Sequence, residues 1–272
     1  MKTIATLIML FSTIASVGQP NCFVYEGDCK KACELFLNTP YQGKWESQKL
    51  YDSAIALCPD FSFAHHERSV AFLKNGEFTQ WREYMDQAVE LNPKTFLGNR
   101  GWCRFKFLHD YKGALEDLNA LQKLNKGFLG WSGDGDYDLR VVMALCYREL
   151  GDIKHALTLF DEYFLEKENQ ANGLSAGSFD YLHYGVTRLK NGEREQALAA
   201  LKQQVKIYKQ LPDTYYYIAM IHKDQGNTDL ATENLLLANK FMQEGYSRKD
   251  PYCEALDEVY PTDIRKAMAH KE

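Results

Sequence analysis

Three aspartates alternate within a glycine-rich stretch of the sequence, GWSGDGDYD at residues 130–138. Asp134, Asp136 and Asp138 match the first half of a calcium-binding loop, D-x-D-x-D. The sixth position of such a loop must be glycine and here is Leu139, and the glutamate of the twelfth position is also missing. The Lys-Ser/Thr pair of a phosphate-binding loop is absent as well. We therefore expect a connecting loop in which Asp136 or Asp138 caps the next helix.

A second candidate for chemistry is GLSAG, Gly173 to Gly177, which matches the G-x-S-x-G nucleophile elbow. That motif works as a strained turn between a strand and a helix, followed in the chain by an acid and a histidine. Here Ser175 lies between two helical patterns, and His183 and His222 fall at ordinary helical positions. We expect a loop at this place and no catalytic residue, with a hydrolase built on such loops as an alternative.

The adjacent pair His65 and His66 invites a metal interpretation. Neighbouring residues on a helix point in different directions and do not readily share one ion. No HExxH motif or pair of catalytic carboxylates accompanies them. The sequence therefore predicts no metal and no cofactor.

Four of the seven cysteines lie near the N-terminus, at Cys22, Cys29, Cys33 and Cys58. Asp28 can cap a helix that begins at Cys29, which would place Cys29 and Cys33 one turn apart on the same face. A zinc site would need further ligands at close spacing, and none is present. We expect a disulfide that joins one of these two residues to Cys22 or Cys58.

Two other cysteines occur in apolar helical patterns and are predicted to be buried and free, Cys103 and Cys146.

The first 18 residues have the features of a secretory signal peptide: Lys2, an apolar run over residues 4–14, and small residues at Ser16 and Gly18. The apolar run is shorter than the roughly 20 residues that span a bilayer. We expect export to the periplasm, cell envelope or exterior, where disulfides form. The net charge of −5 and the apolar share of 45% indicate an ordered globular protein and do not favour nucleic acid as a partner.

The elements that must position these residues repeat along the chain. The segment from Phe63 to Pro93 contains two helical patterns around a turn at Asn75-Gly76, and Pro59 and Pro93 are 34 residues apart. One position near the start of each second helix recurs at spacings of 34, 33, 42, 41 and 34 residues, at Ser47, Trp81, Ala114, Ala156, Ala197 and Ala231. Six helical pairs follow, with extra residues before the fourth pair (residues 130–138) and before the fifth.

This pattern resembles the tetratricopeptide repeat, a 34-residue helix–turn–helix unit. The resemblance covers roughly residues 28 to 240. It implies an all-α fold, a right-handed α–α superhelix of about six helical hairpins with a concave binding surface. We divide the chain into a signal peptide (1–18), a repeat domain (19–240) and a C-terminal capping segment (241–272). In that last segment Pro251 and Pro261 each precede a short predicted helical stretch.

The resemblance to exported bacterial envelope proteins of this family implies a non-enzymatic scaffold or adaptor. In such arrays the first helix of each pair lines the groove. Carried onto this chain, the groove positions give seven candidate partner-binding residues: Phe63, His66, Arg100, Arg148, Phe179, Tyr216 and Lys223.

The groove positions also predict what is bound. Relatives that grip a terminal carboxylate carry Lys where this chain has Val141, Leu182 and Tyr216, so an acidic tail is not expected. An apolar or helical segment of a partner protein is predicted instead. A carbohydrate or small ligand held by aromatic residues such as Trp102 and Trp131 is the alternative.

Overall fold

The computed structural model describes residues 18–169 and 176–269. Over these ranges the chain forms a short 3-10 helix, η1 (Cys22–Val24), and thirteen α-helices, without a β-strand. Twelve of the α-helices pair into six hairpins: α1 (Gly27–Leu37) with α2 (Trp45–Leu57), α3 (Ser62–Asn75) with α4 (Phe78–Leu91), α5 (Pro93–Leu108) with α6 (Tyr111–Leu124), α7 (Leu139–Glu149) with α8 (Ile153–Asn169), α9 (Asp180–Lys190) with α10 (Arg194–Ile207), and α11 (Pro212–Asp224) with α12 (Thr228–Gln243). The last helix is α13 (Pro261–Ala269).

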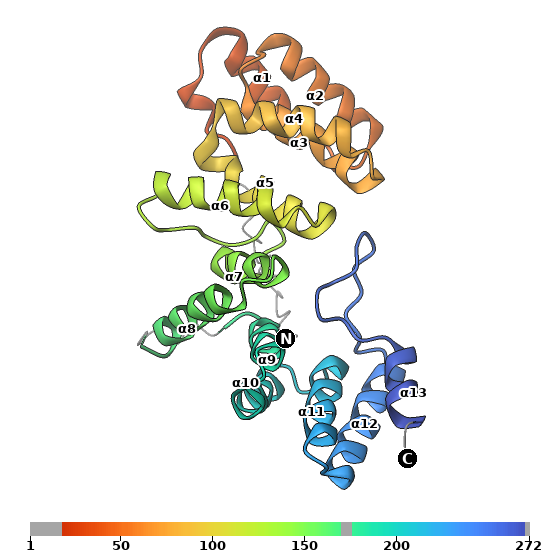
Figure 1. Cartoon of the computed structure of the whole chain (residues 1–272). Coiled ribbons are helices and arrows are strands. Elements are labelled where there is room, and N and C mark those ends of the chain that lie inside the picture. The colour runs from red at the N-terminus through yellow and green to blue at the C-terminus, as the bar shows by residue number, and fades with distance from the viewer. Residues whose placement is uncertain (1–17, 170–175, 270–272) are drawn as a thin grey trace, which may run out of the picture.

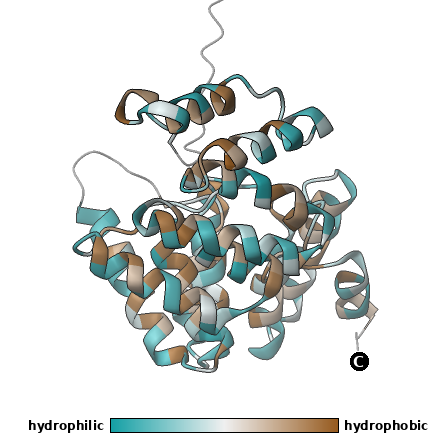
Figure 2. Cartoon of the chain, turned by 90° about the horizontal axis from the view of Figure 1, so that it is seen from above, coloured by the Kyte–Doolittle hydropathy of each residue, from teal (hydrophilic) through white to brown (hydrophobic). Residues whose placement is uncertain are grey.

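The hairpins stack in chain order into a curved array, from α1 and α2 at one end to α11 and α12 at the other (Figure 1). Hydrophobic and hydrophilic residues alternate along most helices (Figure 2), as expected when each hairpin buries one surface against each neighbour. The predicted all-α superhelix of six hairpins is confirmed. The predicted signal peptide, apart from Gly18, and Ser175 of the GLSAG motif lie outside the described residues.

The recurring position in each second helix is where the two helices of a hairpin cross. It is at most 5% exposed in all six hairpins: Ser47, Trp81, Ala114, Ala156, Ala197 and Ala231. In the fifth hairpin, a glycine of the first helix, Gly185, lets the backbones of α9 and α10 approach more closely. A Cβ atom added at Gly185 would lie 2.7 Å from Leu201 Cγ and 3.3 Å from the Ala197 carbonyl oxygen. The positions that recur in the sequence are therefore the positions at which the two helices of each hairpin are in contact.

Turns and caps set the helix boundaries. Gly76 ends α3 in the left-handed region, with φ of +77°, where residues with a side chain are strained. The third hairpin has His109 at the equivalent turn, with φ of +52°. Asp138 caps α7 by accepting a hydrogen bond from the Arg140 backbone N–H at 3.0 Å, as predicted. Asp28 does not act as predicted: α1 begins at Gly27, and Asp28 lies within its first turn.

Two disulfides link the N-terminal hairpin. Cys22 is bonded to Cys33, and Cys29 is bonded to Cys58. One turn of α1 separates Cys29 from Cys33, so the two bonds leave the same helix for different elements, η1 and the end of α2. The predicted disulfide candidates are thus all paired. The two cysteines predicted to be buried and free, Cys103 and Cys146, are so.

At the other end, α13 packs against α12, and Ile264 is fully buried there. Between α12 and α13 the chain makes a long excursion that we call the strap, residues 246–260. The strap rises from the last hairpin across the opening of the arc toward α5 (Figure 1). No helix follows Pro251, contrary to the prediction, because Pro251 lies in a bend whose backbone N–H groups bond to the Asp250 side chain. Of the residues described, no helix is long and apolar enough to cross a membrane.

Candidate partner-binding groove

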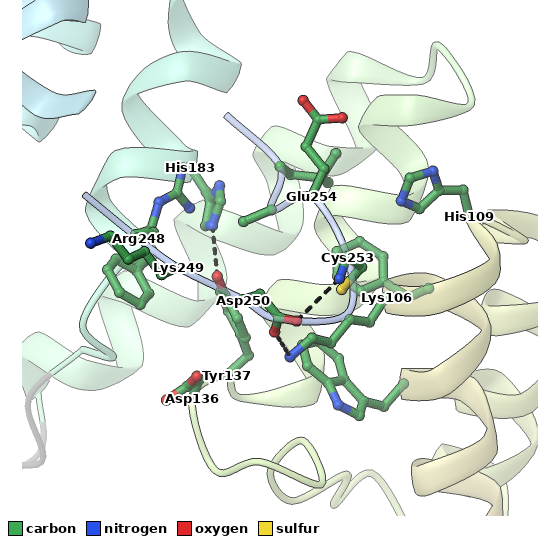
Figure 3. Close-up of a pocket in the computed structure, with 15 residues that line it drawn as sticks. Lys106, His109, Asp136, Tyr137, His183, Arg248, Lys249, Asp250, Cys253 and Glu254 are labelled. Carbon is green, nitrogen blue, oxygen red and sulfur yellow. Dashed lines mark hydrogen bonds and ion pairs between the residues drawn. The ribbon is translucent and has the colours of Figure 1, made fainter. Parts of the chain in front are cut away.

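A cavity of about 190 Å³ lies on the concave side, between the strap and the first helices of the middle hairpins (Figure 3). Its walls are aromatic and come from α5, from the loop before α7 and from the start of α9: Trp102, Phe105, Tyr137 and Phe179. The strap closes it with both charged and apolar residues, Arg248, Lys249, Asp250, Cys253, Glu254, Ala255 and Leu256. The concave face therefore holds an extended stretch of the protein's own chain.

The tip of the strap is held by Lys106, in the last turn of α5. Its ammonium donates hydrogen bonds to Asp250 of the strap at 2.7 Å and to Asp134 at 2.9 Å. Burial would lower the pKa of Lys106, but the two carboxylates raise it above its ordinary value. For Asp250 the directions are reversed: burial would raise its pKa, but the hydrogen bond from Lys106 lowers it below its ordinary value. Beside this ion pair the ring of Tyr252 lies 6.4 Å from that of Phe107.

The middle of the strap is held by a buried charge pair. Arg148 of α7 donates to Asp257 Oδ2 at 2.7 Å, and their side chains are 0% and 5% exposed. His183 of α9 donates to the same oxygen from Nδ1 at 2.7 Å and accepts from Tyr137 Oη at Nε2, 3.1 Å away. This arrangement uses both nitrogens of a neutral imidazole.

The electrostatics of this pair follow from burial and from the neighbouring charges. Burial lowers the pKa of His183, and the nearby Arg248 and Arg148 guanidinium groups act in the same direction, against Asp257. Burial alone would raise the pKa of Asp257, but Arg148 and His183 hold it well below its ordinary value. The site is therefore an aspartate–arginine ion pair that is oriented by a neutral histidine.

The base of the strap is fixed to α11. Arg248 donates to Asp213 Oδ1 at 3.1 Å, and the Val259 backbone N–H donates to the same oxygen at 2.8 Å. The Arg248 guanidinium also lies 5.4 Å from the ring centre of Phe179. One carboxylate of the last hairpin thus binds both ends of the strap.

The structure distributes the seven predicted groove residues among different environments. Arg148 and Phe179 contact strap residues, and Tyr216 packs into the cluster that holds α13. Phe63 packs edge-on against Phe96, with 5.3 Å between ring centres.

The remaining candidates lie away from the strap. His66 is 5% exposed and bonded to Asn99 at 3.2 Å. Arg100 forms ion pairs with Asp117 of α6 and Asp86 of α4, which neutralise its charge within the helix array. Lys223 is exposed on α11.

The glycine-rich loop at 130–138 supports the groove from one side. Its Ser132 hydroxyl donates to Asp134 at 2.6 Å, and Asp134 in turn accepts from Lys106. In the part of the chain that the structure describes, no group of three or more His, Cys, Asp or Glu residues could hold a metal ion. Of the two tryptophans considered for a sugar site, Trp102 lines the cavity, whereas Trp131 lies against Lys167 of α8.

Sequence reasoning missed the strap and, among the residues that receive it, His183 and Tyr137. His183 sits at an ordinary helical position, and Tyr137 is one aromatic residue within a polar loop. The prediction against an acidic ligand considered only the family's lysine positions. The groove instead has cations at Lys106 and Arg148. One proline and four acids within residues 246–260 were the available signal that this segment is extended and carries negative charge.

Comparisons with known proteins agree with this architecture. The family model described as a tetratricopeptide repeat matches residues 64–95, which cover most of α3 and α4. Among proteins of curated function, none matches the sequence.

Solved structures share the fold at low sequence identity. PilF of Pseudomonas aeruginosa aligns with a TM-score of 0.63 and 14% identity, over 90% of this chain and 98% of that chain. PilW, a widely conserved type IV pilus biogenesis factor, aligns with a TM-score of 0.59 and 15% identity, over 89% and 96%. YrrB, a tetratricopeptide-repeat protein with an unusual peptide-binding site, aligns with a TM-score of 0.51 and 17% identity, over 72% and 93%. The chain thus has the fold of a tetratricopeptide-repeat solenoid, and its second hairpin carries the sequence of that repeat.

Proposed function

We propose that this protein is an exported, non-enzymatic scaffold that binds a segment of a partner polypeptide in its concave groove. The observation that carries the proposal is the strap itself. An extended stretch of chain lies in the groove, held by ion pairs at Lys106 and Arg148 and by aromatic contacts. A surface that holds one extended segment in this way has the chemistry to hold another.

Two features support export to the cell envelope. The first 18 residues have the composition of a signal peptide. The two disulfides are bonds that persist in oxidising compartments. Purification from the envelope fraction, followed by intact-mass measurement, should give a chain that begins after Gly18 and lacks four thiol hydrogens. A chain that retains Met1, or that has seven free thiols, would contradict export.

Site-specific photo-crosslinking tests the groove. A benzoylphenylalanine at Phe179 lies beside the cavity, whereas the same group at Leu236, exposed on α12, serves as the control. We expect protein crosslinks in cells from position 179 and not from position 236. Equal crosslinking from both positions would show that the groove is not the binding surface.

A further inference from the structure

The strap is tethered at both ends and could leave the groove without unfolding the solenoid. On one side it follows α12, and on the other it leads into α13, whose buried Ile264 keeps it against the last hairpin. The strap itself contains no helix or strand. Its polar contacts lie at three places: Asp250, Asp257 and the base, where the Arg248 side chain and the Val259 backbone N–H bond to Asp213. Leu256 and Val259 add apolar packing.

The contact between Asp257 and Arg148 is chemically incomplete. A single oxygen, Asp257 Oδ2, accepts from both Arg148 and His183. Arg148 Nη2 is buried and has no hydrogen-bond partner in the part of the chain that the structure describes. A guanidinium binds a carboxylate best through two parallel hydrogen bonds, one to each oxygen. Arg148 is therefore not fully satisfied by the strap.

The backbone conformation of Asp257 is a second unfavourable feature of the docked strap. Its φ is +60°, in the left-handed region, which costs a residue with a side chain about 1 kcal/mol. A carboxylate on an unstrained segment that pairs with Arg148 through both oxygens would avoid this cost and satisfy the free N–H group. The groove thus has chemistry that another acidic segment could use better than the strap does.

We propose that the strap is a built-in competitor, and that the partner is an extended acidic segment that displaces it by placing carboxylates on Lys106 and on Arg148 with His183. This inference rests on the proposed function, since it names the partner of the same groove. In the strap these carboxylates are seven residues apart, at Asp250 and Asp257. The partner is expected to carry a similar pair with an apolar or aromatic residue between them, corresponding to Tyr252 and Leu256.

The test uses the strap sequence as an added peptide. The probe is a fluorescein-labelled peptide of residues 246–260 that carries Cys253→Ser, titrated into the full chain produced by export. In the Asp257→Asn chain the internal competitor is weakened. We expect the affinity of this chain for the probe to be at least about tenfold higher than that of the wild-type chain. A probe with Asp250→Asn and Asp257→Asn should bind neither chain.

Further variants keep the test decisive. The double variant Asp250→Asn/Tyr252→Ala loosens the tip of the strap and leaves the buried Arg148 pair intact, in case Asp257→Asn impairs folding. Glu244→Gln, an exposed acid before the strap, is the matched control and should bind the probe as the wild type does. Hydrogen exchange of the strap amides, measured in the same samples, should be faster in both strap variants and unchanged in Glu244→Gln.

The outcomes separate the two proposals. If all chains bind the acidic probe equally, or if the Asn probe binds as well as the acidic one, the groove remains a binding site and the strap inference is overturned. Unchanged exchange of the strap in both variants also overturns it. If the strap opens in the variants and no chain binds the probe, the proposed function itself fails.

Discussion

The two ends of the solenoid are closed by different chemistry. At the N-terminal end, Cys22–Cys33 and Cys29–Cys58 join η1, α1 and α2 covalently around the buried Phe61. At the C-terminal end, α13 covers the last hairpin and the strap docks through buried ion pairs. The first closure can open only by reduction, whereas the second can open by exchange of one charged partner for another. The comparison indicates a fixed end and an adjustable end.

The largest effect is expected from breaking the fixed end. Replacing both Cys29 and Cys58 by alanine removes a bond that closes a separation of 29 residues. We expect a loss of about 3–4 kcal/mol in the free energy of unfolding, because the unfolded chain gains freedom. Guanidinium titration of the variant against the wild type measures it. Cys253→Ala, at a free and half-buried thiol, is the control. A loss below about 1 kcal/mol would show that the disulfide does not hold this end together.

A smaller loss is expected at the adjustable end. Asp257→Asn removes the charge that pairs with Arg148. Leaving one member of a buried pair without a partner costs about 3–5 kcal/mol. Arg148 would keep its second ion pair, with Glu149 at 2.8 Å. Here the strap can leave and water can reach Arg148, so we expect about 1–3 kcal/mol. Thermal unfolding measures the loss, with Glu244→Gln as control. A loss as large as that of the disulfide variant would mean that the strap is a fixed part of the core.

The pH dependence of the adjustable end should be weaker still. The pKa of His183 is lowered from 6.5 by burial and by the nearby guanidinium groups. Below pH ~6.5 the unfolded chain protonates His183 more readily than the folded chain does. The free energy of unfolding therefore has its full value above pH ~6.5 and falls as the pH drops below it. Burial raises the pKa of Asp180 to about 6, so this group titrates in the same range. The wild type is therefore compared with His183→Asn. We expect a steeper loss in the wild type between pH 7 and 5, and parallel curves would contradict this assignment.

The smallest effect is expected from a charge pair at the fixed end. Asp28 and Lys31 form an exposed ion pair on α1, 2.8 Å apart. Water and salt screen such pairs. Asp28→Asn should therefore leave the melting temperature unchanged, in contrast to Asp257→Asn. A clear decrease in differential scanning calorimetry would mean that burial does not explain the difference between the two ends.

The sequence by itself determined the repeated unit. The spacing from Ser47 to Ala231 predicted six hairpins, because five of the six crossing positions hold the small residues that let two helices approach closely, with Trp81 as the departure. The cap at Asp138 and the involvement of the N-terminal cysteines in disulfides were predictable for a similar reason. These features depend on residues that lie within one hairpin or directly beside it.

Only the tertiary structure decided what occupies the groove. Arg148 and Asp257 are 109 residues apart, and no local pattern relates them. Their contact depends on the curvature of the last three hairpins, α7 to α12, and on a strap without regular secondary structure, for which hydrophobic periodicity gives no signal. The groove positions could be carried over from the repeat, but the charge that meets them could not. Folding brings that charge back from beyond the last hairpin to the middle of the array.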